Sequence, residues 1–360
     1  MEAQRTPVRV QSEDLEYIVN LVKSKLITYE IQVSPTEIKF FYLNSDNPDI
    51  SESFDQIRQI LIPKGYIPFL YEGGEHFLQI SRRPATKFRG IYVNVVMLIL
   101  TLASTIYVGS IYSANYVSGG GGEAMRLLYG FIFFSVPLMS ILGVHELGHY
   151  IVAKKFKVRA SLPFFIPFPF SIGTFGAFIS LRDPVPNRKA MTEIGIAGPL
   201  SGFLLAFPLL FAAEYLQKII PYVHNYSTGF SINFPLIYNL LDLHPEVHPL
   251  FPMVLAVWVG IFATAMNLLP VGQLDGGHVV RGLLGKRANI IDYIFVALLF
   301  GLGFVYEGWW LLAIFVILVG LTHPPALDDY SKIPMRDIAL GVIALVMFII
   351  TFTPIPLVAV

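Results

Sequence analysis

Two histidines and a glutamate interrupt an otherwise apolar stretch near the middle of the chain. His145, Glu146 and His149 lie in the run I-L-G-V-H-E-L-G-H-Y-I-V-A, residues 141–153. Positions four apart lie on one face of a helix, so a helix would place both imidazoles one turn apart. Imidazole is a good zinc ligand, and H-E-x-x-H is typical of zinc hydrolases in which the glutamate is the general base. The pattern indicates metal-assisted hydrolysis, and a buried His–Glu hydrogen-bond cluster is the structural alternative.

A carboxylate further along the chain could complete a metal site. Zinc in hydrolases typically has three protein ligands and one open position. Asp275 lies in A-M-N-L-L-P-V-G-Q-L-D-G-G-H, residues 265–278, where a proline and a glycine break a helix. The sequence therefore predicts a Zn²⁺ site formed by His145, His149 and Asp275. The alternative for Asp275 is a role as N-cap of the helix that follows it.

The composition is that of an integral membrane protein. Hydrophobic residues make up 54% of the chain and charged residues only 14%, and the mean hydropathy is +0.62. A soluble domain carries about a quarter charged residues. The formal net charge of zero gives no electrostatic reason to expect a nucleic-acid partner. Cysteine is absent, which excludes disulfides and thiol catalysis, and the N-terminal segment has no apolar core, so we expect no cleaved signal peptide.

The first 85 residues have a different pattern from the rest. Apolar residues recur at helical spacing in 13–26 and 51–62, and alternating segments typical of hairpins lie within 28–43 and 66–80. This αββαββ order predicts a small soluble α+β domain over residues 1–85. Residues 86–360 would then form the membrane domain that carries the metal site.

Apolar stretches close to the roughly 20 residues that a membrane helix needs recur through the second part of the chain. We expect a polytopic α-helical membrane protein with six or seven spans, because the fifth and sixth stretches are short enough to merge. The stretches are 90–112, 127–153, 192–213, 250–269, 290–306, 309–321 and 338–352.

Lysine and arginine are distributed unevenly between the two sides of this arrangement. They gather before the first stretch, between the second and third, and after the fourth. The positive-inside rule therefore predicts a multi-pass protein of the cell membrane with its N-terminal domain in the cytoplasm. The H-E-x-x-H motif would lie towards the cytoplasmic end of its span.

Residues 161–185 are apolar yet rich in proline and glycine. Non-helical backbone at membrane depth is tolerated only where protein or a wet cavity covers it, so we expect a re-entrant or β-hairpin segment. The run G-T-F-G-A-F-I-S-L predicts a strand beside the metal site, with an edge that would bind an extended substrate. Gly173, Phe175 and Gly176 are the candidate substrate-binding residues, and an interfacial loop anchored by phenylalanines is the alternative.

Several of these motifs together resemble one family. H-E-L-G-H in one span and N-x-x-P-x-x-x-L-D-G-G in a later one are similar to the site-2 protease family of intramembrane zinc metalloproteases. The resemblance covers residues 141–281 and includes G-T-F-G-A and, at 197–202, A-G-P-L-S-G. The soluble N-terminal domain and T-H-P-P at 322–325 resemble the branch with archaeal, cyanobacterial and plastid members, which lacks the inserted PDZ domain.

The resemblance implies roles for individual side chains. It implies that His145, His149 and Asp275 bind zinc. It also implies that Glu146 is the general base and that Asn267 holds substrate or polarises the scissile carbonyl. For Asn267 a simple interhelical hydrogen bond is the alternative.

The expected function is a zinc-dependent endopeptidase that cleaves transmembrane segments of other proteins within the lipid bilayer. We expect a prokaryotic, archaeal source. One alternative is a membrane metallopeptidase of the prenyl-protein-processing type, which would use a later glutamate as third ligand. Another is a non-enzymatic metal transporter or scaffold. The later glutamates are Glu193, Glu214 and Glu246.

Overall fold

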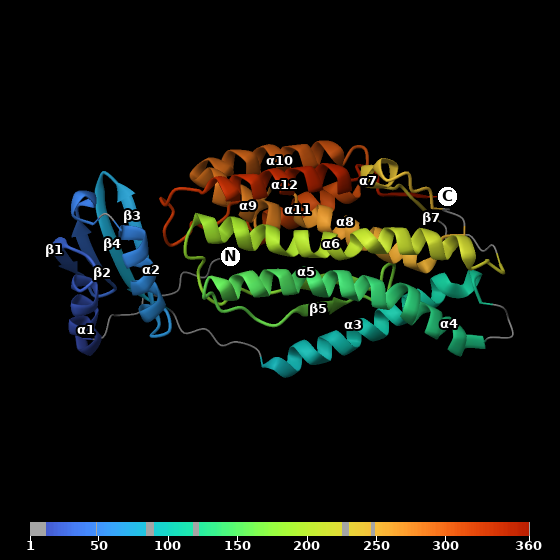
Figure 1. Cartoon of the computed structure of the whole chain (residues 1–360), viewed down its shortest axis with the longest axis horizontal. Coiled ribbons are helices and arrows are strands. Elements are labelled where there is room, and N and C mark those ends of the chain that lie inside the picture. Colours follow the sequence, from blue (N-terminus) through green and yellow to red (C-terminus); the bar gives the residue numbers. More distant parts are fainter. Residues whose placement is uncertain are drawn as a thin grey trace.

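A small strand-containing domain and a larger helical body make up the molecule (Figure 1). The structure is a computed structural model that describes residues 12–47, 49–83, 90–117, 122–224, 230–245 and 249–359. The two parts lie end to end, with the strands of the N-terminal domain at one end and the long helices running away from it (Figure 1).

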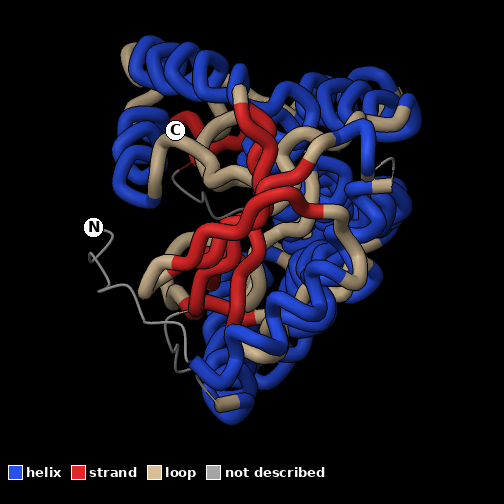
Figure 2. The backbone as a smooth tube through the Cα atoms, turned by 90° about the vertical axis from the view of Figure 1, so that its left-hand side faces the viewer, coloured by secondary structure: helices blue, strands red, loops and turns tan. Residues whose placement is uncertain are grey.

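The N-terminal domain has the predicted order of two helix-hairpin units. Its strands form one antiparallel sheet in the order β1-β2-β4-β3, which faces the viewer in Figure 2. Both helices place their apolar side chains in one core with alternate residues of the sheet, such as Ile18, Phe54 and Phe40. The elements are α1 (Ser12–Lys23), β1 (Thr28–Val33), β2 (Glu37–Tyr42), α2 (Ile50–Leu61), β3 (Tyr66–Gly73) and β4 (Glu75–Arg82).

The helical body follows the predicted sequence of apolar stretches. Helix α4 continues through a π-helical turn, Phe131–Ser135, into α5, so one long rod contains the H-E-x-x-H motif. The helices are α3 (Ile91–Tyr112), α4 (Gly122–Gly130), α5 (Val136–Lys155), α6 (Arg188–Ile219), α7 (Leu236–Leu240), α8 (Pro252–Asn267), α9 (Asp275–Leu284), α10 (Ala288–Leu302), α11 (Gly308–Val319) and α12 (Met335–Thr351). A short sheet pairs β7 (Phe230–Ile232) with β8 (Leu357–Ala359).

Three helical segments among the described residues are long and apolar enough to cross a membrane. They are Ile91–Asn115, Gly122–Lys155 and Arg188–Ile219. The expected fourth span, 250–269, is the shorter helix α8, and most of its side chains are buried among other helices. Hydropathy alone does not separate such a core helix from one that faces lipid.

The proline- and glycine-rich segment after α5 contains a β-hairpin. Strand β5 (Phe164–Pro167) pairs with β6 (Thr174–Phe178) in antiparallel register. The pairing continues past β6, because Leu181 forms a bridge with Ala160. The hairpin lies between α3 and α5 (Figure 1).

Backbone pairing joins the two parts of the molecule. Leu327, from the segment between α11 and α12, is buried in the core of the N-terminal domain. Its carbonyl accepts the Leu70 N–H of β3 at 2.9 Å, and its own N–H donates to the Val185 carbonyl at 3.0 Å. The N-terminal sheet therefore continues through residue 327 to the segment that follows the hairpin.

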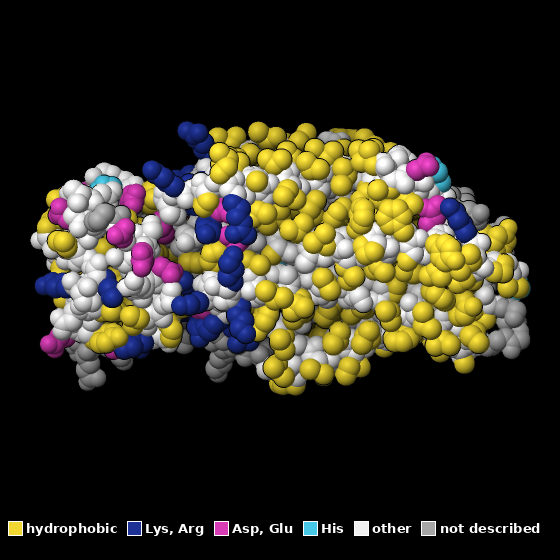
Figure 3. All heavy atoms as spheres, in the orientation of Figure 1, with side chains coloured by type: hydrophobic (Ala, Val, Ile, Leu, Met, Phe, Trp, Pro, Cys, Tyr) yellow, Lys and Arg dark blue, Asp and Glu magenta, His cyan; other side chains and the backbone are white. Residues whose placement is uncertain are grey.

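The surface separates into an apolar body and a basic belt. Figure 3 shows hydrophobic side chains over most of the visible face of the helical body, and lysines and arginines gathered where it meets the N-terminal domain. Lys155, Arg159, Lys189 and Arg336 are exposed members of this basic belt. The distribution is that of a membrane protein whose apolar helices face lipid.

Candidate zinc site

Helix α5 presents three ionisable side chains to the interior of the body. His145, Glu146 and His149 are 4%, 4% and 6% exposed, so all three are shielded from bulk water. Ionisable groups inside an apolar body are costly unless they are paired or bind a metal. The helical spacing of four brings the two rings together, with their centroids 5.0 Å apart.

Asp275 reaches the same point from the first turn of α9. The chain leaves α8 and turns at Gly272, which has a φ of +59°. A Cβ on Gly276 would lie 2.1 Å from the Leu268 carbonyl oxygen, so only glycine lets α9 begin this close to the turn. The N-cap of α9 is Leu274, without a side-chain capping bond, and the Asp275 carboxylate points to the histidines instead. The N-cap alternative for Asp275 is therefore wrong.

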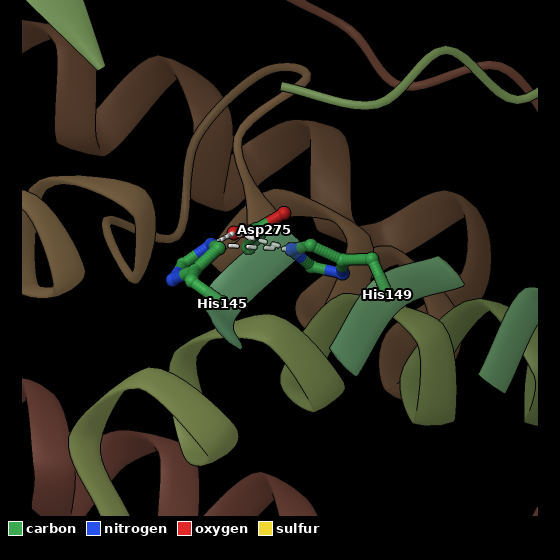
Figure 4. Close-up of side chains that lie close together, drawn as sticks. All are labelled: His145, His149 and Asp275. Carbon is green, nitrogen blue, oxygen red and sulfur yellow. Dashed lines mark hydrogen bonds and ion pairs between the residues drawn. The ribbon is translucent and has the colours of Figure 1, made fainter. Parts of the chain in front are cut away.

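The three side chains converge on one point (Figure 4). The Asp275 Oδ2 atom lies 3.1 Å from His145 Nε2 and 3.2 Å from His149 Nε2, and the two nitrogens are 3.2 Å apart. Ligands of a tetrahedral zinc at about 2.1 Å would be roughly 3.4 Å from one another. The observed triangle is close to that size.

A second hydrogen bond orients one of the imidazoles. His149 Nδ1 donates to the Ile194 carbonyl at 2.7 Å, which leaves the Nε2 lone pair directed at the centre of the triangle. Metal-bound histidines are commonly oriented in this way. Two imidazole nitrogens and one carboxylate oxygen are a ligand set that suits zinc, so the residues present fit the metal.

Glycines bring α6 against the metal-binding face of α5. A Cβ on Gly198 would lie 2.0 Å from His149 Nε2, and one on Gly202 would lie 3.2 Å from His145 Cβ. On α5, Gly148 meets Ser201 in the same way, with 2.3 Å between its ideal Cβ and the Ser201 Oγ. The A-G-P-L-S-G run therefore supplies the space in which the histidines lie.

Glu146 lies beside the triangle without closing it. Its Oε1 atom is 3.9 Å from His145 Nε2, and the Ile179 backbone N–H, just beyond β6, faces its carboxylate. Glu146 also lines two adjoining cavities, of about 220 and 250 Å³. The carboxylate is thus next to both the ligand atoms and open space, as a general base needs to be.

Asn267, the last residue of α8, lies at the boundary of the same two cavities. Its amide Nδ2 is 3.3 Å from His145 Nε2. This placement suits either a hydrogen bond across helices or a contact with a substrate carbonyl.

The candidate substrate-binding residues of the hairpin fall at different places. Phe175, which is 67% exposed, and Gly176 line the larger of the two cavities together with His145 and Glu146. Gly173 packs on α3 instead, where Ser104 Oγ donates to its carbonyl at 2.6 Å. Nearer the metal triangle the hairpin contributes Ala177, Phe178, Ile179 and Leu181.

A third cavity, of about 430 Å³, adjoins the metal-site cavity towards the N-terminal domain. The two share Ile179, Leu181, Gln273 and His278 in their walls. His323 also lines the third cavity, and its ring lies 4.2 Å from that of His278 between centroids. We call this third cavity the vestibule.

The later glutamates that could replace Asp275 as a ligand are engaged elsewhere. Glu193 pairs with Lys155 at 2.7 Å, and Glu214 pairs with Lys218 at 2.6 Å. Glu246 lies outside the described residues. The geometry therefore favours the Asp275 site over the site of a prenyl-protein-processing peptidase.

Comparison with known proteins agrees with this geometry. The profile of Peptidase family M50 matches residues 133–302. "Probable zinc metalloprotease EGY1, chloroplastic" from Arabidopsis thaliana is 28% identical over 307 residues, which are 77% of this chain and 55% of that protein. "Probable zinc metalloprotease EGY2, chloroplastic" from Oryza sativa subsp. indica is 28% identical over 65% of this chain and 44% of its own length.

A third relative, EGY3 of Oryza sativa subsp. japonica, is 24% identical over 93% of this chain and 58% of that protein. The chain thus spans about half the length of the curated relatives it matches. Residues 133–302, which include every member of the metal triangle, are a Peptidase family M50 domain of the site-2 protease type, in a chain homologous to plastid zinc metalloproteases.

Proposed function

We propose that this protein is a zinc-dependent endopeptidase that cleaves the transmembrane segments of other membrane proteins. The observation that carries the proposal is the meeting of His145, His149 and Asp275 from two distant helices, with Glu146 beside them. In this proposal His145, His149 and Asp275 bind the zinc and Glu146 is the general base. The substrates are proteins with a membrane-spanning helix.

The chemistry follows from the neighbours of Glu146. Zinc, when bound, lowers the pKa of water and polarises the scissile carbonyl. Glu146 would take a proton from water and deliver it to the leaving amine, with the Ile179 N–H facing its carboxylate. Asn267, at 3.3 Å from His145 Nε2, would contact the carbonyl oxygen of the substrate.

The substrate would bind as an extended strand along the hairpin. Ser161 N–H donates to the Ser180 carbonyl and Arg182 N–H to the Arg159 carbonyl, so residues 180 and 182 pair with the β5 side. Backbone groups alternate in direction along a strand, so those of Ile179 and Leu181 face the other edge, along the metal-site cavity. Strand pairing there would offset the helix hydrogen bonds that an unwound substrate loses.

A cavity lies at each end of the edge formed by Ile179 and Leu181. The cavity that contains Phe175 is lined largely by apolar residues of α5, α8 and the hairpin, whereas the vestibule contains Asp183, His278 and His323. A substrate helix would enter from the apolar side, and the cleaved polar end would leave through the vestibule. The candidate substrate-binding residues Phe175 and Gly176 would then meet the segment that enters.

The membrane arrangement that we propose has six or seven spans in the cell membrane, completed by the shorter helices α8, α10, α11 and α12. The N-terminal domain, residues 1–85, would lie in the cytoplasm, and the basic belt beside it supports this orientation. The chain has no cysteine, so single cysteines at Glu52 and His244 can be labelled with a membrane-impermeant maleimide. Labelling of position 244 but not 52 in intact cells is expected, and the reverse result would overturn the orientation. We propose a prokaryotic, archaeal source from the resemblance to that branch.

The central test is cleavage by the purified full-length protein in lipid vesicles. Glu146→Gln is expected to keep one zinc per chain and to lower the rate of cleavage by about 10²–10⁴-fold, the range lost with a general base. Asp275→Ala is expected to lose both zinc and cleavage, whereas Glu193→Ala, the matched control, should keep its zinc. Zinc transport into vesicles without any peptide product would favour the transporter alternative and overturn the proposal.

A further inference from the structure

Asp183 is a buried carboxylate at the root of the β5–β6 hairpin, outside the metal triangle. Its side chain is 2% exposed. The Arg159 side chain donates to it from Nε, at 2.9 Å to Oδ2 and 3.2 Å to Oδ1, and from Nη2, at 2.8 Å to Oδ1. The Arg159 backbone N–H also donates to Oδ2, at 3.0 Å. Arg83 is the second partner, with Nη1 to Oδ1 at 3.0 Å, and its other terminal nitrogen donates to the Arg182 carbonyl.

The two arginines come from different parts of the molecule. Arg159 begins the hairpin on the β5 side, where its carbonyl pairs with the Arg182 N–H at 2.7 Å. Arg83 follows β4 and is fixed to the N-terminal domain by its own N–H, which donates to the Gly65 carbonyl at 2.7 Å. Asp183 therefore ties both ends of the hairpin to the N-terminal domain.

The chain between Asp183 and the general base is short and paired. Leu181 forms a bridge with Ala160, and two residues earlier Ile179 lines the metal-site cavity beside Glu146, with its N–H facing the Glu146 carboxylate. Ile179 and Leu181 are also the residues whose free edge faces the metal-site cavity. A shift at Asp183 would therefore reach both the general base and the substrate-binding edge.

A second connection runs in parallel. Residues 185–187 follow Asp183 directly and pair with 327–328, which pair in turn with Leu70 of β3. The N-terminal domain thus holds the segment after Asp183 through its sheet, as well as Asp183 itself through Arg83.

We propose that Asp183 is a positioning residue through which the N-terminal domain holds the β6 edge against Glu146. This inference rests on the proposed function, because the edge matters only if it binds substrate. Burial acts to raise the pKa of Asp183, but the hydrogen bonds from Arg159 and Arg83 outweigh it, and the pKa lies below its ordinary value. The carboxylate is therefore charged at neutral pH, and its ion pairs with Arg159 and Arg83 persist there.

The test compares Arg83→Ala with Lys157→Ala in the full-length protein. Lys157 also bridges the two parts of the molecule, through its Nζ and the Gln59 side chain at 2.7 Å, but has no bond to Asp183. Arg83→Ala is expected to increase hydrogen–deuterium exchange of the amides in 179–182. It should also lower kcat/KM by about tenfold, within the range that misplaced groups cause. Zinc content should stay at one per chain.

Lys157→Ala should leave both the exchange and kcat/KM at their wild-type values, and Arg83→Lys, which keeps the charge, should recover part of the activity. Equal exchange and equal kcat/KM in all variants would overturn the proposal, as would equal losses in Arg83→Ala and Lys157→Ala. The exchange measurement does not need turnover and can be repeated in the Glu146→Gln background. If the wild-type protein cleaves nothing, the proposed function fails, while exchange still decides whether Asp183 holds the edge.

Discussion

The metal triangle and the β5–β6 hairpin lie side by side but are held in different ways. The triangle is positioned by the close packing of α6 against α5. Gly198 and Gly202 of α6 lie directly against the two imidazoles. The hairpin is held at its tip by the Ser104 bond to Gly173 and at its root by Asp183. The metal triangle therefore depends on local packing of the body, whereas the free edge of the hairpin depends on contacts between distant segments, one of them in the N-terminal domain.

The largest effect should come from adding one methyl group under the metal. Gly198→Ala places a Cβ 2.0 Å from His149 Nε2, so the imidazole must leave its position, and we expect loss of bound zinc and of cleavage. Gly176→Ala is the matched control in the hairpin, because its φ is +100° but no heavy atom lies within 4 Å of the added carbon. It should keep its zinc and lose only part of its cleavage rate. If elemental analysis shows that Gly198→Ala retains its zinc, the metal triangle does not depend on this close packing.

The next effect concerns the contact between the two regions. Ile179→Pro removes the N–H that faces the Glu146 carboxylate, at a position that does not pair with β5, so the hairpin itself should persist. We expect a decrease of about 10-fold to 100-fold in kcat/KM with zinc unchanged. Ile179→Val keeps the N–H and should behave like the wild-type protein. An unchanged rate in the proline variant would show that this contact does not contribute.

A smaller effect is expected where the N-terminal domain meets the body. Leu327→Ala removes a side chain that is 2% exposed in the core of that domain. A buried Leu→Ala change costs about 2–5 kcal/mol, so the free energy of unfolding of the domain should fall by that amount while zinc stays bound. Leu43→Ala, at a position 50% exposed in the same domain, should change it little. Chemical denaturation followed by far-UV circular dichroism measures both, and equal losses would contradict the assignment of Leu327 to this core.

The smallest effect is a pH dependence at the hairpin root. The Asp183 pKa is lowered from 3.8 in the folded protein, so its contribution to stability is complete above that value and is lost as pH falls below it. The melting temperature of Asp183→Asn should therefore lie below that of the wild-type protein by a constant amount at neutral pH. The difference should shrink once the pH falls below 3.8. A difference that grows on acidification would contradict the sign of the pKa shift.

The meeting of His145, His149 and Asp275 could be predicted from the sequence because their signal is local. The H-E-x-x-H spacing fixes His145 and His149 on one helix face, and Asp275 stands between a helix break and two glycines. The resemblance to the site-2 protease family, confirmed by the Peptidase family M50 match, indicated that the H-E-x-x-H motif and the segment of Asp275 belong to one site. The order of elements in the N-terminal domain followed from alternation and helical periodicity in the same way.

The contacts that place the hairpin could not be predicted. Arg83 and Asp183 are 100 residues apart and are ordinary residue types, so no spacing links them. The Ile194 carbonyl that orients His149 is a backbone atom, which carries no sequence signal at all. The length of α8 was missed for a related reason, since burial by protein and burial by lipid select the same apolar residues.

X-ray absorption spectroscopy of the zinc-loaded full-length protein tests the central claim most directly. The structure predicts two imidazole nitrogens and a carboxylate oxygen at roughly 2.0–2.2 Å from the metal, and the loss of this zinc environment in Asp275→Ala. A spectrum without histidine ligands, or one that is the same in the wild-type protein and Asp275→Ala, would contradict the site and with it the proposed protease.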